Sequence, residues 1–369
     1  MQIQVRSLTF STHCCKRLPQ RQHSGRDRTH MGKGSTLHEI ARDAGVSIAT
    51  VSRVARGVGQ VSPATRKKVQ DAIDRHNFRP SHFGRALVNR RHGALGIVFP
   101  GLSGPYYSDV INGFEEEAVN AQVSVHIMGT HFLRQSVDMV LDMADRVDGL
   151  AVMGDVIPED AVRRLADRGE RVVLLAGGPL VGVPTVRTEN LAAMARLTTH
   201  LLSDHGYGRL VFVGNPDGSS DATYRWQGFL QAHRRLGVEP PDEPIRVGLA
   251  QSHGFIAVSR LLDEKELPDA IVCANDEIAL GAVVALMDRG VRVPEDVAVT
   301  GFDDISMAGL AASGLTTVHQ PMRELGAETA RQLLRHVEGD LDVSLDRVLE
   351  TQVVIRGSCG CGVDDPSAK

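Results

Sequence analysis

From residue 94 onward, short apolar runs alternate with segments of helical periodicity. The first run, residues 94–99, stops at Pro100 and is followed by a predicted helix over about 107–120. Runs this short and this apolar are typical of parallel strands that are buried on both faces. Further helices are expected near 134–146, 158–168, 190–205 and 322–337, and further strands at VSVHIM, GLAVMG, RVVLLAGG, RLVFVG, PIRVG, DAIVCAN, DVAVTGF and VLETQVVIRGS. Because the alternation occurs in two series, it predicts an α/β body of two doubly wound parallel-sheet lobes.

Residues 36–80 follow a different pattern, which predicts three short helices. Thr36 and Glu39 have the spacing of a capping box at the start of the first helix, and Gly45 is suited to ending it. Ser47 can cap the second helix, and Ser62, followed by Pro63, can cap the third. The expected buried residues are Leu37, Ile40, Ala41, Ala44, Val51, Val54, Ala55, Val69, Ala72 and Ile73. The other side of the second helix would expose Ile48, Ala49, Ser52 and Arg53, a surface that fits a DNA major groove.

Charge favours DNA contact over an ordinary helical hairpin for this all-α segment. Residues 32–92 contain 12 Lys or Arg and 4 Asp or Glu, a net charge of +8. Residues 1–31 contain 6 basic and 1 acidic side chains, a net charge of +5, so the total of −4 leaves −17 for residues 93–369. A basic helical segment joined to an acidic body is expected when one domain contacts phosphates and the other binds a different ligand.

Cysteine content and hydropathy exclude several classes of protein. The five cysteines are Cys14, Cys15, Cys273, Cys359 and Cys361. An odd count without a disulfide framework predicts a reducing compartment, the cytoplasm. Cys273 lies in an apolar run and is expected in the core. Because Cys359 and Cys361 have no second pair at zinc spacing, no metal site and no cofactor are expected. The sequence has no apolar run of membrane-spanning length, so no membrane contact is predicted.

Polar residues follow several of the predicted strands, where the ligands of doubly wound sheets bind. Aromatic rings can stack on a sugar or heterocycle, and carboxylates, amides and an arginine can hydrogen-bond hydroxyl groups. Each candidate also has a structural interpretation: a helix cap for Asn275 or Asp276, a turn for Asp303 and Asp304, a surface ion pair for Arg225, core packing for Tyr106. The candidates are Tyr106, Tyr107, Arg225, Asn275, Asp276, Asp303 and Asp304.

The first segment resembles the DNA-binding head of the LacI/GalR family of transcriptional repressors. The resemblance rests on TLHEIARDAGVS, TVSRVARG, VSPATRKKVQDAIDRHNFRP and the hinge segment PSHFGRALV. It implies that Ile48, Ala49 and Arg53 read bases. It also implies that Leu87 wedges into the minor groove at the centre of the operator. Phosphate contacts or caps are expected at Thr36, Ser47, Thr50 and Ser52, with Arg85 among the basic residues near the backbone.

The body resembles the same family's periplasmic-binding-protein-like effector domain. GPYYSDVINGFEEEA, HLLSDHGYGRLVFVG, ATYRWQGF, the segment from PDAIVCANDEIALGA to VAVTGFDDI, and VVIRGS carry this resemblance. By resemblance, Tyr106 and Tyr107 stack on the effector and Arg225 clamps it. Asn275 and Asp303 are then the polar contacts of the second lobe, while the Asp276 position caps the following helix. Leu249 stands where many members have an aromatic ring, so the pocket offers a sugar one ring fewer.

Together these features predict a repressor that binds operator DNA as a homodimer and responds to a small molecule. The effector is expected to be a sugar or sugar derivative; the alternative is a nucleoside or purine with corepressor logic. A sugar-binding transport component is disfavoured by the head, and an enzyme by the lack of a nucleophile, nucleotide-loop or metal motif. The expected domains are a disordered or misassigned extension (1–35), the head (36–80), a hinge (81–92), the effector and dimerisation domain (93–358) and a tail (359–369).

Overall fold

The computed structural model describes residues 37–56, 59–76, 91–263, 267–311, 313–340 and 342–362. The chain forms two compact units, residues 1–80 and 81–369. The expectations for Thr36, the hinge with Arg85 and Leu87, and the N-terminal extension fall outside the described residues. Within the described ranges, no helix combines the length and the apolar character that crossing a membrane requires.

The first unit contains the three expected helices within its described residues: α1 (Leu37–Ala44), α2 (Ile48–Arg56) and α3 (Pro63–Arg75). Gly45 has a φ of +65°, a left-handed conformation that ends α1. The hydroxyl oxygen of Ser47 accepts a hydrogen bond from the Thr50 amide at 3.2 Å, and Ser62 caps α3 in the same way. Six of the ten residues expected in the core are buried: Ile40, Ala41, Val51, Val54, Val69 and Ala72. The other four are only partly buried: Leu37, Ala44, Ala55 and Ile73.

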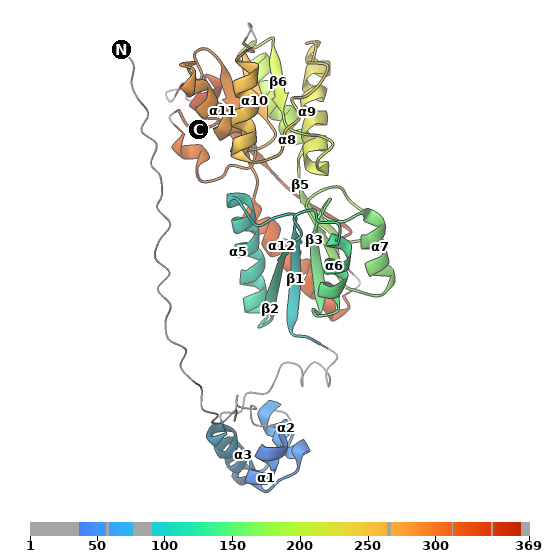
Figure 1. The fold of residues 1–369 in the computed structure, drawn as a ribbon. Coiled ribbons are helices and arrows are strands. Elements are labelled where there is room, and N and C mark those ends of the chain that lie inside the picture. Colours follow the sequence, from blue (N-terminus) through green and yellow to red (C-terminus); the bar gives the residue numbers. More distant parts are fainter. Residues whose placement is uncertain are drawn as a thin grey trace, which may run out of the picture. The chain divides into compact units, whose positions relative to one another are not determined.

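The N-lobe of the second unit is built on one sheet, described here with six strands in the order β10-β5-β4-β3-β1-β2, all parallel. Its strands are β1 (Ala94–Phe99), β2 (Ser124–Gly129), β3 (Gly149–Met153), β4 (Val172–Leu175), β5 (Thr185–Thr188) and β10 (Asp346–Leu349). Its helices are α5 (Pro105–Asn120), α6 (Ser136–Ala144), α7 (Glu159–Asp167) and α12 (Met322–Glu338). Figure 1 shows these helices around the sheet.

Helices cover both faces of this sheet because side chains of the buried strands alternate between them. Leu95 and Ile97 of β1 join the core that includes α5 and α12, whereas Ala94 and Val98 join the core that includes α6 and α7. The helices α5 and α12 approach closely at Gly113, where an added Cβ would lie only 1.8 Å from the carbonyl oxygen of Arg323. The doubly wound arrangement predicted for this half of the body is therefore confirmed.

The C-lobe has a sheet of three described strands in the order β6-β7-β8, again parallel, and an antiparallel pair β9-β11. The strands are β6 (Leu210–Val213), β7 (Ala270–Cys273), β8 (Ala298–Thr300), β9 (Thr317–His319) and β11 (Gln352–Val354). The helices are α8 (Leu191–Ser203), α9 (Ser220–Leu236), α10 (Gln251–Leu261) and α11 (Asp276–Asp288), with short 3-10 turns η1 (Ala308–Leu310) and η2 (Gly357–Cys359). Cys273 is fully buried in β7, as expected.

The described chain passes between the lobes at three places: from β5 to α8, from β9 to α12, and from β10 to β11. Two sequence expectations were wrong here. VLETQVVIRGS is not one strand, because β10 pairs with β5 of the N-lobe while β11 pairs with β9 of the C-lobe. PIRVG forms a single bridge, between Ile245 and Val213, rather than a strand. The four-residue strand β5 was not predicted, because three of its residues, Thr185, Arg187 and Thr188, are polar.

Candidate functional site

Arg225 lies at the centre of a buried polar network between the two lobes. It comes from the second turn of α9, after the carboxyl end of β6, and only 5% of its surface is exposed. Its Nε donates to the side-chain oxygen of Asn190 at 2.7 Å, and one terminal nitrogen donates to the Ala274 carbonyl at 2.6 Å. The guanidinium carbon stands 3.8 Å from the centre of the Phe302 ring. The side chain is thus held in one orientation rather than lying on the surface.

Asp303 faces Arg225 from the loop after β8, with 3.5 Å between its Oδ1 and the arginine. The same carboxylate oxygen accepts a hydrogen bond from Gln320 at 2.6 Å. Burial raises the pKa of Asp303 to about 7, although Arg225 and then Gln320 act in the opposite direction. Its φ of +117° is a conformation that residues other than glycine rarely adopt. Strain of this kind is concentrated at functional sites, since surrounding contacts must maintain it.

Four further residues complete this network, and the sequence did not single them out. Asn190 immediately precedes α8, but its side chain does not cap that helix; its amide donates to Asp221 at 2.8 Å. Asp221 precedes Arg225 by one helical turn and also accepts the amide of Gly177 from the N-lobe at 3.2 Å. Thr188 donates its hydroxyl to Gln320, which joins two of the segments that cross between the lobes. One available signal was the spacing of Asp221 and Arg225 on a single helix face.

Tyr106 and Tyr107 lie at the start of α5, after β1, and are both partly buried. Burial, followed by the nearby Asp221 and Asp303 carboxylates, raises the pKa of Tyr106 well above its usual value. The Tyr107 ring packs edge-on against Phe99 with 5.5 Å between centroids. Burial raises its pKa to about 12, and Glu277 of the C-lobe contributes next. Tyr106 therefore borders the Arg225 network, whereas Tyr107 lies nearer to the core and to Glu277.

The start of α11 corrects one expectation. Asn275, not Asp276, is the cap of this helix: its side-chain oxygen accepts from the Ile278 amide at 2.9 Å. The Asn275 amide nitrogen donates to the Leu249 carbonyl at 3.0 Å. Asp276 is fully buried and accepts from the Ile305 amide and the Thr317 hydroxyl. A carboxylate can accept these bonds within the core, while the amide of Asn275 can serve the cap and a second partner together.

Asp304, the remaining carboxylate in this loop, holds a turn in place. It pairs with Arg356 at 2.7 Å and with His319 at 3.1 Å. Asp276 and Asp304 are thus engaged in structural contacts. The pair of freely placed carboxylates that glycoside hydrolysis requires is therefore not formed by these residues.

On the first unit, α2 presents the surface that the sequence predicted. Ile48, Ala49 and Arg53 are exposed, while Thr50 and Ser52 are partly buried. The stem of Arg53 lies near Gly59, where an added Cβ would be 3.4 Å from Cδ. Asp43 of α1 bonds Arg75, the last residue of α3, at 2.9 Å and His76, which follows it, at 3.1 Å, and so links these two helices. The described exposed side of α2 thus includes Ile48, Ala49 and Arg53.

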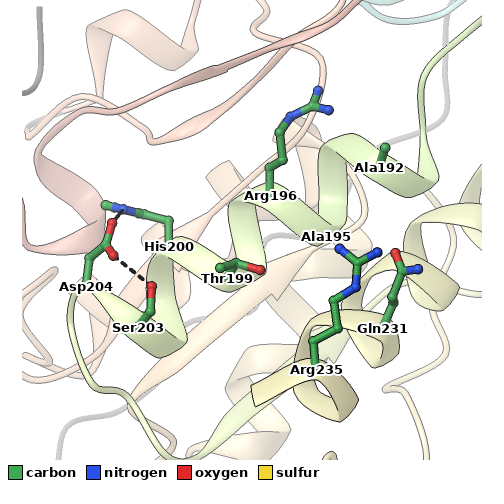
Figure 2. Close-up of a pocket in the computed structure, with 9 residues that line it drawn as sticks. All are labelled: Ala192, Ala195, Arg196, Thr199, His200, Ser203, Asp204, Gln231 and Arg235. Carbon is green, nitrogen blue, oxygen red and sulfur yellow. Dashed lines mark hydrogen bonds and ion pairs between the residues drawn. The ribbon is translucent and has the colours of Figure 1, made fainter.

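A surface groove of about 530 Å³ lies elsewhere, between α8 and α9 of the C-lobe. Figure 2 shows its lining, with the two arginines Arg196 and Arg235 and, at one end, His200 and Asp204. None of the predicted effector residues lines it. It belongs to the outer side of a helix pair and is not the predicted effector site.

The fold and these two surfaces define a class: a DNA-binding regulator with a two-lobed ligand-binding domain. Residues 36–81 match the family of bacterial regulatory proteins, lacI family, and residues 199–359 match a periplasmic binding protein-like domain. The repressor CytR of Escherichia coli K12 is 30% identical over 328 residues, which are 88% of this chain and 96% of CytR.

Solved structures agree with this assignment. The lac repressor dimer bound to operator and an anti-inducer superposes with a TM-score of 0.79 at 26% identity, over 89% of this chain and 99% of that one. The regulator CelR in complex with cellobiose gives 0.65 at 29% identity, over 88% and 99% of the two chains. The chain belongs to the LacI family: it is a DNA-binding transcriptional repressor with an effector-binding domain, not an enzyme.

Proposed function

We propose that the effector of this repressor is a sugar or sugar derivative that binds at the Arg225 network. The observation that carries the proposal is the geometry of Arg225 itself, whose buried guanidinium is set between Asn190, Asp221 and Asp303. Hydroxyl groups can both donate to these carboxylates and accept from the guanidinium. A site built to pair with hydroxyls discriminates strongly against ligands that lack them.

The polar content of the site favours a sugar over a nucleoside. Asn190, Arg225 and Asp303 offer several buried hydrogen-bonding groups, and a sugar presents more hydroxyl groups to such partners than a purine base does. Tyr106 borders the network, but Leu249, not a ring, stands beside Asn275. The similar regulator CelR is seen with cellobiose, which supports a carbohydrate.

A thermal-shift screen of the full chain against mono- and disaccharides and nucleosides tests this proposal. A true effector should raise Tm as its concentration exceeds Kd, in proportion to RT ln(1 + [L]/Kd). Stabilisation by sugars in the wild type, lost in Arg225→Ala, is the expected result. A nucleoside that stabilises the chain while every sugar fails would replace the sugar with the alternative effector.

We also propose that α2 reads the operator through Ile48, Ala49 and Arg53. Their exposure beside the hydroxyl groups of Ser47, Thr50 and Ser52 supports this assignment. Arg53→Ala should weaken binding to a selected operator by about 1–3 kcal/mol and relax the base preference at one position. Gel shifts on the selected operator and on single-base variants measure both effects, with Arg75→Ala, a residue paired to Asp43, as control. Unchanged affinity and preference in Arg53→Ala would refute the assignment.

Operator binding as a homodimer is the third part of the proposal. The helices α10 and α11 expose Ile256, Val284 and Met287, at 47, 47 and 62% of their surfaces. Neighbouring apolar groups exposed in this way are typical of interfaces, and the similar lac repressor structure is a dimer. Sedimentation of the full chain at micromolar concentration should give twice the mass of one chain. The homodimer proposal would be contradicted if the wild-type chain sedimented as a monomer at this concentration and Val284→Glu had the same mass.

A further inference from the structure

Four side chains that are far apart in the sequence converge at one end of the C-lobe. Two come from the carboxyl end of α8 and the turn after it, and two from η2 and the residues that follow it. They lie outside the Arg225 network and have no part in the proposed effector site. We call them the Cys/His cluster; its members are His200, His205, Cys359 and Cys361.

The distances within the Cys/His cluster are those of a metal coordination sphere. The Nε2 atoms of His200 and His205 are 3.2 Å apart. The sulfur of Cys361 is 3.6 Å from the first of these nitrogens and 3.4 Å from the second, and the sulfur of Cys359 is 3.6 Å from the first. All four ligand atoms lie within 4.8 Å of one another.

Tetrahedral zinc requires nearly the same spacings as these four nitrogen–nitrogen and nitrogen–sulfur distances. With Zn–S of about 2.3 Å and Zn–N of about 2.0–2.1 Å, the edges of the tetrahedron are about 3.4 Å between nitrogens and about 3.6 Å between nitrogen and sulfur. Two sulfurs and two imidazoles in tetrahedral geometry indicate zinc or an iron–sulfur site, and a Cys₂His₂ set is a common ligand set of structural zinc. Two thiolates also neutralise the charge of Zn²⁺, so the ion can be accommodated where Cys359 is fully buried.

The surroundings hold these side chains in the orientation that a metal needs. His200 Nδ1 lies 2.7 Å from Asp204 Oδ2, and Asp204 also accepts from the Ser203 hydroxyl at 2.7 Å, as Figure 2 shows. This carboxylate fixes the tautomer that leaves Nε2 with a lone pair directed into the cluster. The His205 ring stacks on Tyr207 at 5.1 Å between centroids, with 11° between the planes.

The backbone of the Cys-Gly-Cys turn is fixed as well. Tyr207 donates its hydroxyl to the Cys359 carbonyl at 2.9 Å. Gly360 has a φ of +101°, and an added Cβ there would lie 2.9 Å from the same hydroxyl. Glycine is therefore required between the two cysteines, which brings their sulfurs to the same side of the turn.

We propose that the Cys/His cluster binds one Zn²⁺ ion in a closed, structural site. All four positions of the tetrahedron are then filled by protein, which leaves none for substrate. Binding displaces the protons of the two thiols and forms two Zn–S and two Zn–N bonds, with no change in oxidation state. The ion ties residues 359–361 to the carboxyl end of α8, and so closes a loop of about 160 residues that passes through the C-lobe and also includes α12 and β10 of the N-lobe.

The test is zinc stoichiometry of the full chain, reduced and reconstituted with zinc, then passed over a chelating resin. Because Cys14 and Cys15 are further thiols, all proteins carry Cys14→Ser and Cys15→Ser. The variant adds Cys361→Ser and His205→Gln, and the matched control adds Cys273→Ala and His253→Gln, which lie outside the cluster. Elemental analysis should give about one zinc per chain in the parent and the control and almost none in the variant.

Two further readouts keep the test decisive if the variant folds poorly. Cobalt in place of zinc in the parent should give a thiolate-to-cobalt charge-transfer band and the intense visible bands of a tetrahedral ion. Zinc should raise the Tm of the parent by roughly 5–15 °C and leave the variant unchanged. The proposal would be overturned by a parent that binds no zinc, by a variant that retains zinc, or by a cobalt spectrum without thiolate bands. A variant that retains zinc, or a cobalt spectrum without thiolate bands, would also show that the thiols and imidazoles of the cluster only hydrogen-bond one another.

Discussion

The two ends of α8 lie in polar clusters of opposite construction. At the amino end, Asn190 stands between the Arg225 guanidinium and the Asp221 carboxylate, so that each donor meets an acceptor. At the carboxyl end, nitrogens and sulfurs that all carry lone pairs approach one another at 3.2–3.6 Å. The first arrangement is satisfied by the protein and can exchange partners with a ligand. The second gathers imidazole nitrogens and thiol sulfurs, which can hydrogen-bond one another and, once the thiols lose their protons, can also serve as ligands of a cation.

The largest effect on stability is expected from removing the guanidinium of the Arg225 network. Arg225→Ala leaves Asp303 and the Ala274 carbonyl buried without this donor, which should lower the free energy of unfolding by on the order of 3 kcal/mol. Arg246→Ala is the matched control from the same lobe, because its pairs with Asp217 and Glu243 are exposed to solvent and should contribute little to the free energy of unfolding. Urea unfolding of both variants measures the difference, and equal losses would mean that the Arg225 network is not a buried, coupled unit.

The raised pKa of Asp303 makes the stability of this network depend on pH. Because the pKa of Asp303 is about 7 in the folded chain and about 3.9 in an unfolded one, the folded chain binds one more proton between these pH values. The contribution of Asp303 to the free energy of unfolding is therefore complete below about pH 4 and is lost as the pH rises towards 7. This free energy falls by at most about 1.4 kcal/mol per pH unit in that range. Asp303→Asn should flatten the fall in Tm between pH 4 and 7 relative to wild type. Superimposable profiles would show that Asp303 ionises normally.

Zinc binding by the Cys/His cluster can be weakened without changing any of the four proposed ligands. Asp204→Asn changes only the group that holds His200, so zinc should still bind, but about 10–100-fold more weakly. Competition with a chromogenic chelator gives the affinity, and Asp269→Asn, at a carboxylate that accepts backbone amides beyond Tyr207, is a nearby control. If Asp204→Asn bound zinc as tightly as wild type, its carboxylate would not orient the imidazole.

The smallest effect is expected at the connection between the effector network and the crossing segments. Gln320 donates to Asp303 and accepts from Thr188, so Gln320→Ala removes one link between the predicted effector site and two crossings. Effector binding should persist, while the effector-dependent change in operator affinity shrinks by about 0.5–2 kcal/mol. Paired measurements of effector affinity and operator affinity separate the two. If the effector changed the operator affinity of Gln320→Ala as much as that of wild type, Gln320 would not connect effector binding to DNA binding.

Most of the fold follows from local patterns, and its errors have local causes. The buried runs of β1, β3 and β4 and the cap at Ser47 were predictable because one side chain or one period decides each. Residues 348–358 were predicted as one strand, but the structure has two, β10 and β11, in different sheets. Nothing in the sequence at residues 350–351 indicates that the chain crosses from one lobe to the other there. PIRVG alternates like a strand, yet only Ile245 pairs, because a strand needs a partner as well as a pattern.

Site residues could be predicted only where the residue type and its position after a strand were sufficient to indicate a role. Arg225 and Asp303 follow strands and carry charge, so they could be chosen from the sequence. Asn190, Asp221 and Gln320 have roles that exist only through their partners in space. The Cys/His cluster is the extreme case, because 159 positions separate His200 from Cys359 and the spacing expected of zinc motifs is absent. The three-residue Cys-Gly-Cys motif contains two of the four residues of the cluster, and the fold brings the two histidines to it.

The decisive measurement is the operator affinity of the full chain with and without a saturating effector found by thermal shift. We expect this affinity to change by roughly 5–150-fold in wild type, in either direction, and not at all in Arg225→Ala, whose operator affinity without effector stays near that of wild type. Identical operator affinities of wild type with and without a ligand that stabilises it would show that the Arg225 network binds a molecule that does not control the DNA-binding head.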